Sequence, residues 1–409
     1  MRTVIRNGNL LDTESMSFVG ERDVVVDDGL IVEVTERHEA TGEIDVEIDA
    51  AGQYVMPGLI DGHVHFRLAT MNFHAMVLWS EVEFGINMAR LSANTVERGF
   101  TTVRDLGGDV VGLMRAIAAG STPGPRIVRA GRMLTQTGGH GDAEGGDREV
   151  PACGCSMRGT MFSIVADGVD AVRKAARHNL REGSEFLKVH VSGGVASPSD
   201  PLDSIQYTHD ELRAAVIEAE HRQTYVAAHA YSPEAIQQAV AAGVHSIEHG
   251  NLLDSETARQ MAEADSVLVP TLVTYEAMDQ VGQKFGLPEA NRDKNTVVYE
   301  AGLASLEIAQ SAGVTMGLGT DLLGETQTMQ NQEMVIRSEV QTAEQILRSM
   351  WNVNPRLCHL EGRIGVVTPG AFGDLVVSRV DPLDDITAFA NHTTALSYVV
   401  QGGNVVVER

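Results

Sequence analysis

The sequence predicts an α/β protein: a (β/α)8 TIM barrel with a small β-sandwich domain built from both termini. Three observations predict it. Short apolar segments alternate with helical segments through the middle of the chain, both ends are rich in β-type runs, and 409 residues suit one barrel plus a smaller unit. We therefore expect a β-sandwich of residues 1–56 and 362–409, and a barrel of residues 57–361.

The two ends of the chain have the same sequence pattern. Residues 3–6, 24–26 and 31–34 are short runs rich in Val and Ile, and turns rich in Asn, Asp and Gly separate them. Residues 373–378 and 398–407 repeat this pattern near the C-terminus. We expect the two half-sheets to pair with one another.

Eight apolar segments in the middle of the chain predict the barrel strands. They lie at residues 54–60, 101–105, 126–130, 186–191, 225–228, 245–248, 267–270 and 315–319. Segments rich in Ala, Glu and Arg, such as 210–222, 233–242 and 303–312, predict the intervening helices, and Thr208 and Ser232 mark two helix N-termini. In such barrels the residues that end a strand carry the chemistry.

Composition and charge exclude several classes of partner. Hydrophobic residues make up 43% of the chain, but no apolar run is long enough to span a membrane or to direct secretion, so we expect a cytoplasmic protein. A formal charge of −25 repels nucleic acids and anionic lipids. Cys153 and Cys155 flank one glycine, too close for an unstrained disulfide, and we expect them to be structural rather than metal ligands.

The first barrel segment ends in a pair of histidines, His63 and His65. Side chains two residues apart on a strand face the same way, so both imidazoles converge on the barrel axis. Neutral imidazole is a preferred ligand of zinc and similar cations. Alone, such a pair is a weak signal, because fourteen histidines in this chain produce on the order of half a pair by chance.

Four further strand ends strengthen the metal interpretation. Lys188 lies in the fourth segment, and His229, His249 and Asp321 follow the fifth, sixth and eighth segments. Singly, each has a structural explanation, such as a satisfied core histidine or a helix-capping aspartate. Together they predict a metal site, because unpaired ionisable groups in a barrel mouth are costly to bury.

This pattern resembles that of the amidohydrolase superfamily. The resemblance spans the whole chain and implies the flanking β-sandwich, two divalent metal ions with zinc as the first expectation, and a carbamate formed from carbon dioxide on Lys188 that bridges the metals. Manganese, cobalt or iron would suit the same donors. The implied metal ligands are His63, His65, Lys188, His229, His249 and Asp321.

The segments 136–142, 153–155, 191–197, 229–231 and 319–324 look like those of the prolidase-like group within this superfamily. Members of that group are Xaa-Pro dipeptidases or small carboxypeptidases, and close relatives hydrolyse amides such as ochratoxin. The resemblance implies that His140 and Tyr231 polarise the scissile carbonyl or hold the substrate. We match His190 to no family role and expect it to line the pocket.

These residues predict hydrolysis of an amide bond in a small, carboxylate-bearing substrate such as a dipeptide. A metal-bridging hydroxide would attack the carbonyl, and Asp321 would pass its proton to the leaving nitrogen. Two alternatives stay open: hydrolysis of a cyclic amide, as in imidazolonepropionase- or hydantoinase-like relatives, and a non-catalytic scaffold with the same fold. Lys188 argues against a mononuclear deaminase. Relatives are commonly homo-oligomers, so we expect the same here.

Overall fold

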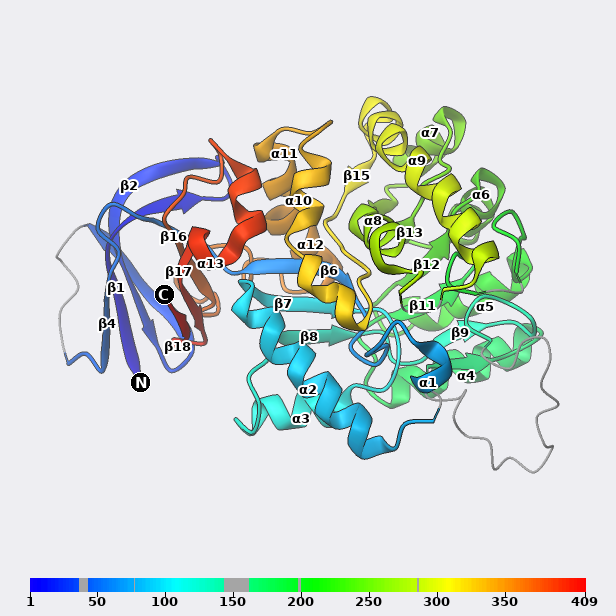
Figure 1. Cartoon of the computed structure of the whole chain (residues 1–409), viewed down its shortest axis with the longest axis horizontal. Helices are drawn as coiled ribbons and strands as arrows, with labels where there is room; N and C mark the ends of the chain where they lie inside the picture. The colour runs from blue at the N-terminus through cyan, green and yellow to red at the C-terminus, as the bar shows by residue number, and fades with distance from the viewer. Residues whose placement is uncertain (37–42, 77, 143–161, 198–199, 285–286) are drawn as a thin grey trace.

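The computed structural model describes residues 1–36, 43–76, 78–142, 162–197, 200–284 and 287–409. Figure 1 shows two regions along its long axis: a sheet made from both ends of the chain, and a larger region of strands and helices made from its middle. Cys153 and Cys155 lie outside the described residues.

Strands from both termini form one eight-stranded sheet. Its hydrogen-bonded order is β18-β17-β16-β5-β1-β2-β3, and β4 pairs with β1. The strands are β1 (Arg2–Asp12), β2 (Ser17–Asp27), β3 (Leu30–Glu36), β4 (Val46–Asp49), β5 (Tyr54–Pro57), β16 (Leu375–Ser378), β17 (Leu396–Gln401) and β18 (Asn404–Glu408). The two ends meet where β16 runs antiparallel to β5, with Val377 opposite Val55.

Parallel strands from the middle of the chain form two further sheets. They are β6 (Leu59–Val64), β7 (Phe100–Asp105), β8 (Arg126–Arg129), β9 (Met133–Thr135), β10 (Ser163–Val165), β11 (Leu187–His190), β12 (Val226–Ala230), β13 (Ser246–His249), β14 (Val267–Val269) and β15 (Thr315–Met316). One sheet has the order β6-β7-β8, and the other β10-β9-β11-β12-β13-β14-β15. The α/β class with a parallel sheet is therefore confirmed.

The first predicted barrel strand, 54–60, is wrong in its bounds. The chain divides there into β5, which belongs to the terminal sheet, and β6, which pairs with β7. Gly58 lies at the division, and a side chain at that position would collide with Thr101. The apolar run looked continuous because both strands are buried.

Helices lie between most of the consecutive parallel strands and after the last of them. They are α1 (Phe73–Met76), α2 (Glu81–Glu97), α3 (Val111–Ala118), α4 (Val169–Arg181), α5 (His209–Glu220), α6 (Pro233–Ala242), α7 (Ser255–Glu263), α8 (Leu272–Val281), α9 (Glu289–Ala312), α10 (Gln332–Arg337), α11 (Ala343–Arg348), α12 (Asn354–Leu357) and α13 (His392–Ala395). Thr208 caps α5 in a capping box with Glu211, and Ser232 caps α6, as predicted. The predicted helix at 303–312 is the last part of α9.

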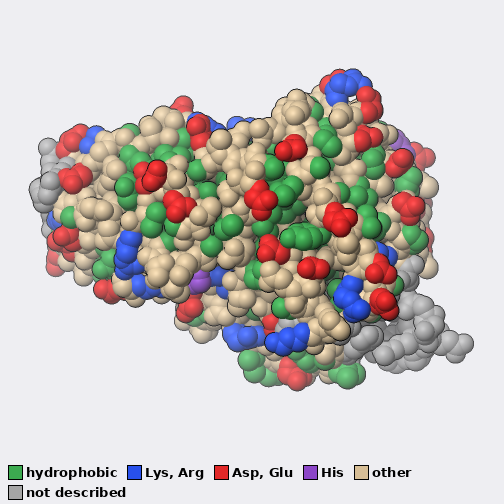
Figure 2. Space-filling model, turned by 45° about the horizontal axis from the view of Figure 1, so that its top comes forward, with side chains coloured by type: hydrophobic (Ala, Val, Ile, Leu, Met, Phe, Trp, Pro, Cys, Tyr) green, Lys and Arg blue, Asp and Glu red, His purple; other side chains and the backbone are tan. Residues whose placement is uncertain are grey.

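A large apolar cluster lies between strands β11 to β13 and helices α4 to α7. Leu187, Val189 and Ile247 contribute from the strands, and Val172 and Ile236 from the helices. This packing fixes the strands, and with them the side chains at their C-terminal ends. Within the described ranges, no helix is both long and apolar enough to cross a membrane. Figure 2 shows acidic side chains scattered over the face that it draws, not gathered in one patch.

Candidate metal centre

Three predicted ligands converge where β6 ends. His63 Nε2 lies 3.3 Å from His65 Nε2, and Asp321 Oδ1 lies 3.4 Å from the first of these nitrogens and 3.3 Å from the second. Donor atoms about 3.3–3.4 Å apart are the edges of a tetrahedron whose centre lies about 2.0–2.1 Å from each, the usual zinc–nitrogen distance. The three donors therefore fit one divalent cation.

His249 lies beside these three donors, at the end of β13. One ligand atom each from His63, His249 and Asp321 lies within 4.8 Å of the others, and His249 Nδ1 is 4.0 Å from Asp321 Oδ2. His249 and Asp321 both have left-handed backbone, with φ of 76° and 51°. Non-glycine residues adopt this conformation at a cost of about 1–3 kcal/mol each, and such strain clusters at functional sites.

Lys188 lies on β11 and is 1% exposed. Burial lowers the pKa of its ammonium group to about 8, although the carboxylates of Glu248 and Asp321 raise it. A lysine with a lowered pKa is more often a free amine near neutral pH, and the free amine is the form that reacts with carbon dioxide. The environment of Lys188 is thus compatible with the predicted carbamate.

His229, His140 and His190 form a second histidine group beside the first. The rings of His140 and His229 stack with centroids 4.3 Å apart, and His190 meets both edge-on. His229 Nε2 lies 3.1 Å from the backbone oxygen of Gly193, and its ring centroid is 4.6 Å from that of His249. The structure therefore places His229 next to the metal centre, with one ring nitrogen on a backbone carbonyl.

Two predicted site residues are the most open to solvent. The side chain of Asp321 is 17% exposed and that of His140 is 15% exposed, whereas the predicted histidine ligands and Lys188 are almost fully buried. His140 Nδ1 lies 3.4 Å from Asp200 Oδ2. Tyr231 is buried, and its hydroxyl lies 2.9 Å from that of Tyr275. A small molecule would therefore approach along Asp321 and His140.

Burial keeps the imidazoles of this centre neutral. It lowers the pKa of His63 and His249 well below the ordinary value, helped by the positive charge of Lys188, and it lowers the pKa of His65 to about 3. Burial also raises the pKa of Asp321 to about 7, against the opposing effect of Lys188. Neutral imidazoles with free lone pairs are metal ligands, so the donor set fits a divalent cation.

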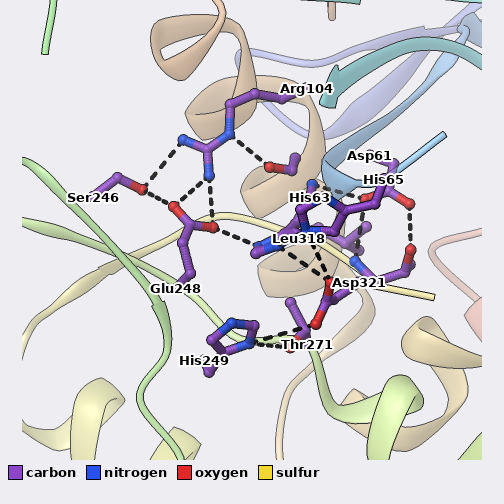
Figure 3. A network of polar contacts seen from close by, with 12 residues as sticks. Asp61, His63, His65, Arg104, Ser246, Glu248, His249, Thr271, Leu318 and Asp321 are labelled. Carbon is purple, nitrogen blue, oxygen red and sulfur yellow. Dashed lines mark hydrogen bonds and ion pairs between the residues drawn. The ribbon is translucent and has the colours of Figure 1, made fainter. Parts of the chain in front are cut away.

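Figure 3 shows a polar network behind these ligands that the sequence reasoning missed. Glu248 is fully buried, contacts His63, and forms an ion pair with the equally buried Arg104. Asp61 accepts hydrogen bonds from the backbone of His63 and from the Thr320 hydroxyl. An arginine in the middle of the apolar segment 101–105 was the available signal, because a buried guanidinium requires a carboxylate partner.

Comparison with known proteins places this site in a family. Residues 54–406 match the Amidohydrolase family. Ochratoxinase of Aspergillus niger is 30% identical over 362 residues, covering 86% of this chain and 75% of that protein. A prolidase solved with N-methylphosphonate-L-proline is 42% identical with a TM-score of 0.94, and a Xaa-Pro dipeptidase with bound methionine is 28% identical with a TM-score of 0.87; both comparisons cover 100% of each chain.

The chain therefore belongs to the amidohydrolase family. It is a hydrolytic enzyme that acts on amide bonds, and its neighbours place it among the prolidase-like members of the superfamily, as the sequence pattern predicted.

Proposed function

We propose that this protein is a binuclear metal-dependent amidohydrolase that cleaves the amide bond of a small, carboxylate-bearing substrate, foremost a dipeptide of the Xaa-Pro type. The convergence of His63, His65 and Asp321 at the spacing of ligands around one cation carries the proposal. The full-length similarity to a prolidase at 42% identity supports the substrate class.

The predicted ligands divide into two groups in this proposal. His63, His65 and Asp321 would hold one metal, His229 and His249 the other, and carbamylated Lys188 would bridge them. When bound, divalent metals lower the pKa of water towards about 7 and polarise a carbonyl oxygen. Zinc is our first expectation, since imidazole and carboxylate are among its usual ligands.

The chain's own groups supply proton transfer and orientation. The carboxyl group of Asp321 lies where the three donors meet and is 17% exposed, so it would take up a proton there and deliver it to the leaving nitrogen. His140 is the partly exposed imidazole of the second histidine group, where it can donate a hydrogen bond to the carbonyl oxygen of the substrate. Tyr231 packs against the rings of His229 and His249, where it would help to hold the substrate.

Two other substrate classes and a non-catalytic scaffold are the alternatives to a dipeptidase. The 30% identity with ochratoxinase over most of the chain supports N-acyl amino acids as further substrates. A cyclic amide is the alternative within the superfamily. A non-catalytic scaffold would not need Asp321 and His249 in strained backbone beside buried, neutral imidazoles.

Hydrolysis of a dipeptide library by metal-replete protein tests the proposal. The library should contain Xaa-Pro, Xaa-Arg and N-acyl amino acids, with a panel of cyclic amides beside it. We expect cleavage of dipeptides by the wild type, almost complete loss in Lys188→Ala, and full activity in Lys174→Ala, whose lysine is exposed on α4. If the metal-loaded protein cleaved a cyclic amide but none of the linear amides, the protein would be a cyclic amide hydrolase instead.

We also propose that the two parallel sheets close into the predicted (β/α)8 barrel, with residues 1–56 and 362–409 as a separate β-sandwich domain. Hydrogen bonds from the Gly62 amide to Leu318 O and from the Asp321 amide to His63 O support closure between β6 and the segment after β15. A cytoplasmic location, a homo-oligomeric assembly and the absence of nucleic-acid and membrane partners stay predictions from the sequence.

A further inference from the structure

Arg104 has a partner for every hydrogen it can donate. Its Nε donates to the backbone oxygen of Gly62 at 2.6 Å, its Nη1 lies 3.0 Å from the Tyr225 hydroxyl and 3.2 Å from Ser246 Oγ, and its Nη2 lies 2.6 and 2.8 Å from the two oxygens of Glu248. A guanidinium has five N–H donors in a fixed plane, and these contacts use all of them. The fully buried Arg104 side chain is therefore fixed in one orientation.

Glu248 connects Arg104 to His63 through its two carboxylate oxygens. Its Oε2 lies 2.8 Å from His63 Nδ1, while Oε1 also accepts from the Ser246 hydroxyl at 2.6 Å. A carboxylate only accepts, so Nδ1 carries the proton and His63 Nε2 presents its lone pair. That lone pair faces Asp321 and His65, where the three donors meet.

Arg104 controls the same histidine in a second way. Gly62, whose carbonyl accepts from Arg104, is the residue before His63, so one guanidinium fixes both the backbone and the imidazole of this ligand. The contacts join residues from β6, β7 and β13 that are up to 185 positions apart in the chain. Local structure at β6 could not hold the ring in this way.

We propose that Glu248 and Arg104 are positioning residues for the metal centre: Glu248 selects the tautomer and orientation of His63, and Arg104 holds Glu248 and the β6 backbone in place. The inference rests on the proposed metal site. Hydrogen-bond partners of ligating histidines typically change metal affinity by about 10–100-fold when they are replaced.

The substitution Glu248→Gln has a specific expected effect. Arg104 donates to both oxygens of Glu248 and Ser246 donates to Oε1 alone, so the amide oxygen would occupy the Oε1 side, where two donors meet, and the amide N–H2 would face His63 Nδ1. Nδ1 would then have to accept, its proton would move to Nε2, and the lone pair needed for a metal would be lost. The shape of the side chain is nearly unchanged, so the variant reverses the hydrogen bond to His63 and removes the Arg104 contact at Oε2 without changing the packing.

Removing one charge of a buried pair can also prevent folding, so a second variant is needed. Arg104→Met/Glu248→Met removes both charges and leaves no uncompensated ion, but it also removes the acceptor for His63. Glu333→Gln is the matched control, since Glu333 is fully buried beside Arg337 and is not among the predicted ligands or their hydrogen-bond partners.

The experiment measures zinc affinity of the chelator-treated, full-length protein by competition with a chromophoric chelator, and the visible spectrum after cobalt loading. Urea unfolding of the metal-free proteins reports folding. We expect zinc affinity to fall about 10–100-fold in Glu248→Gln and in the double variant, with a changed cobalt spectrum. We expect wild-type zinc affinity in Glu333→Gln, whatever its stability.

A folded double variant, or a folded Glu248→Gln variant, with wild-type zinc affinity and an unchanged cobalt spectrum would overturn the inference and leave the ion pair a role in folding alone. A wild-type protein that binds neither zinc nor cobalt would overturn the metal site of the proposed function, and the inference with it. The two failures are distinguishable because the second is seen in the wild type.

Discussion

Buried carboxylates of this protein differ in how their charge is balanced. Glu248 accepts from Arg104, Ser246 and His63, so its charge is shared among strong donors. Glu333 on α10 is equally buried but accepts from the Val273 amide, with Arg337 as the neighbouring cation. Burial raises the pKa of Glu333 to about 8, and Arg337 only partly opposes this effect.

This difference predicts how stability depends on pH at Glu333. Between about pH 4.5 and 8 the folded state keeps the Glu333 proton whereas the unfolded state has lost it, so Glu333 lowers the free energy of unfolding as pH rises through this window. Glu333→Gln removes that dependence. We expect the stability of the variant relative to wild type to improve by on the order of a few kcal/mol across the window.

Urea unfolding of metal-free protein at several pH values from 4.5 to 8.5 measures the effect, because removing metal excludes its own pH linkage. A difference between the two proteins that stays constant with pH would show that Glu333 is ionised in the folded state throughout.

Glycines decide how closely the strands of the site approach. Gly319 lies between β15 and Asp321, and a Cβ there would lie 2.6 Å from Val269 Cγ1 and 2.7 Å from His63 Cβ. Gly85 in α2 is the opposite case: it is exposed, and a Cβ would meet nothing within 4 Å. The same substitution therefore has opposite consequences in the two elements.

Gly319→Ala is expected to lower the free energy of unfolding by about 1–3 kcal/mol, because an added methyl must displace packed atoms. It should also weaken zinc binding, since His63 is one of the groups displaced. Urea unfolding and the zinc competition assay measure both effects. Wild-type zinc affinity in a destabilised variant would mean that Val269, not His63, moves aside.

Gly85→Ala is expected to raise the free energy of unfolding by about 0.5–1 kcal/mol, because alanine loses less backbone entropy than glycine in a helix. Zinc affinity and hydrolysis should stay at wild-type values. A loss of stability on urea unfolding would contradict the open surroundings of this residue.

At the scale of the whole molecule, the terminal sheet and the parallel region are joined by adjacent residues of the chain. β5 of the terminal sheet ends at Pro57 and β6 of the parallel region begins at Leu59, so pairing of the chain termini fixes the entry to the strand that carries His63 and His65. Trp351 is buried and donates to the Gly58 oxygen at this junction. The candidate metal centre then gathers donors from three separate strand ends: β6 with His63 and His65, β13 with His249, and the segment after β15 with Asp321.

Metal removal is therefore expected to destabilise the entire fold. A ligand that binds only the folded state stabilises it by about 2.7 kcal/mol at one hundred times its dissociation constant. Thermal unfolding of wild type should move to higher temperature when zinc is added back to chelated protein. In Lys188→Ala the shift should be smaller, because the proposed bridging ligand is missing; an equal shift would place zinc elsewhere.

The sequence alone determined the fold class and the candidate ligands. The alternation of apolar and helical segments predicted a parallel α/β region, and strand-end positions picked out His63, His65, His249 and Asp321, which the structure brings together. Both predictions could be made from the sequence because periodicity and strand direction are local properties: residues two apart on one strand face the same way.

Only the tertiary structure decided how these ligands are held. The segment 54–60 divides at Gly58, where a side chain would collide with Thr101, and His63 contacts Glu248, which pairs with Arg104; all of these partners are distant in the chain. No pattern in one strand encodes such contacts, because they arise when separate strands pack. The buried charges and strained backbone of the metal centre are stable only because that packing surrounds them.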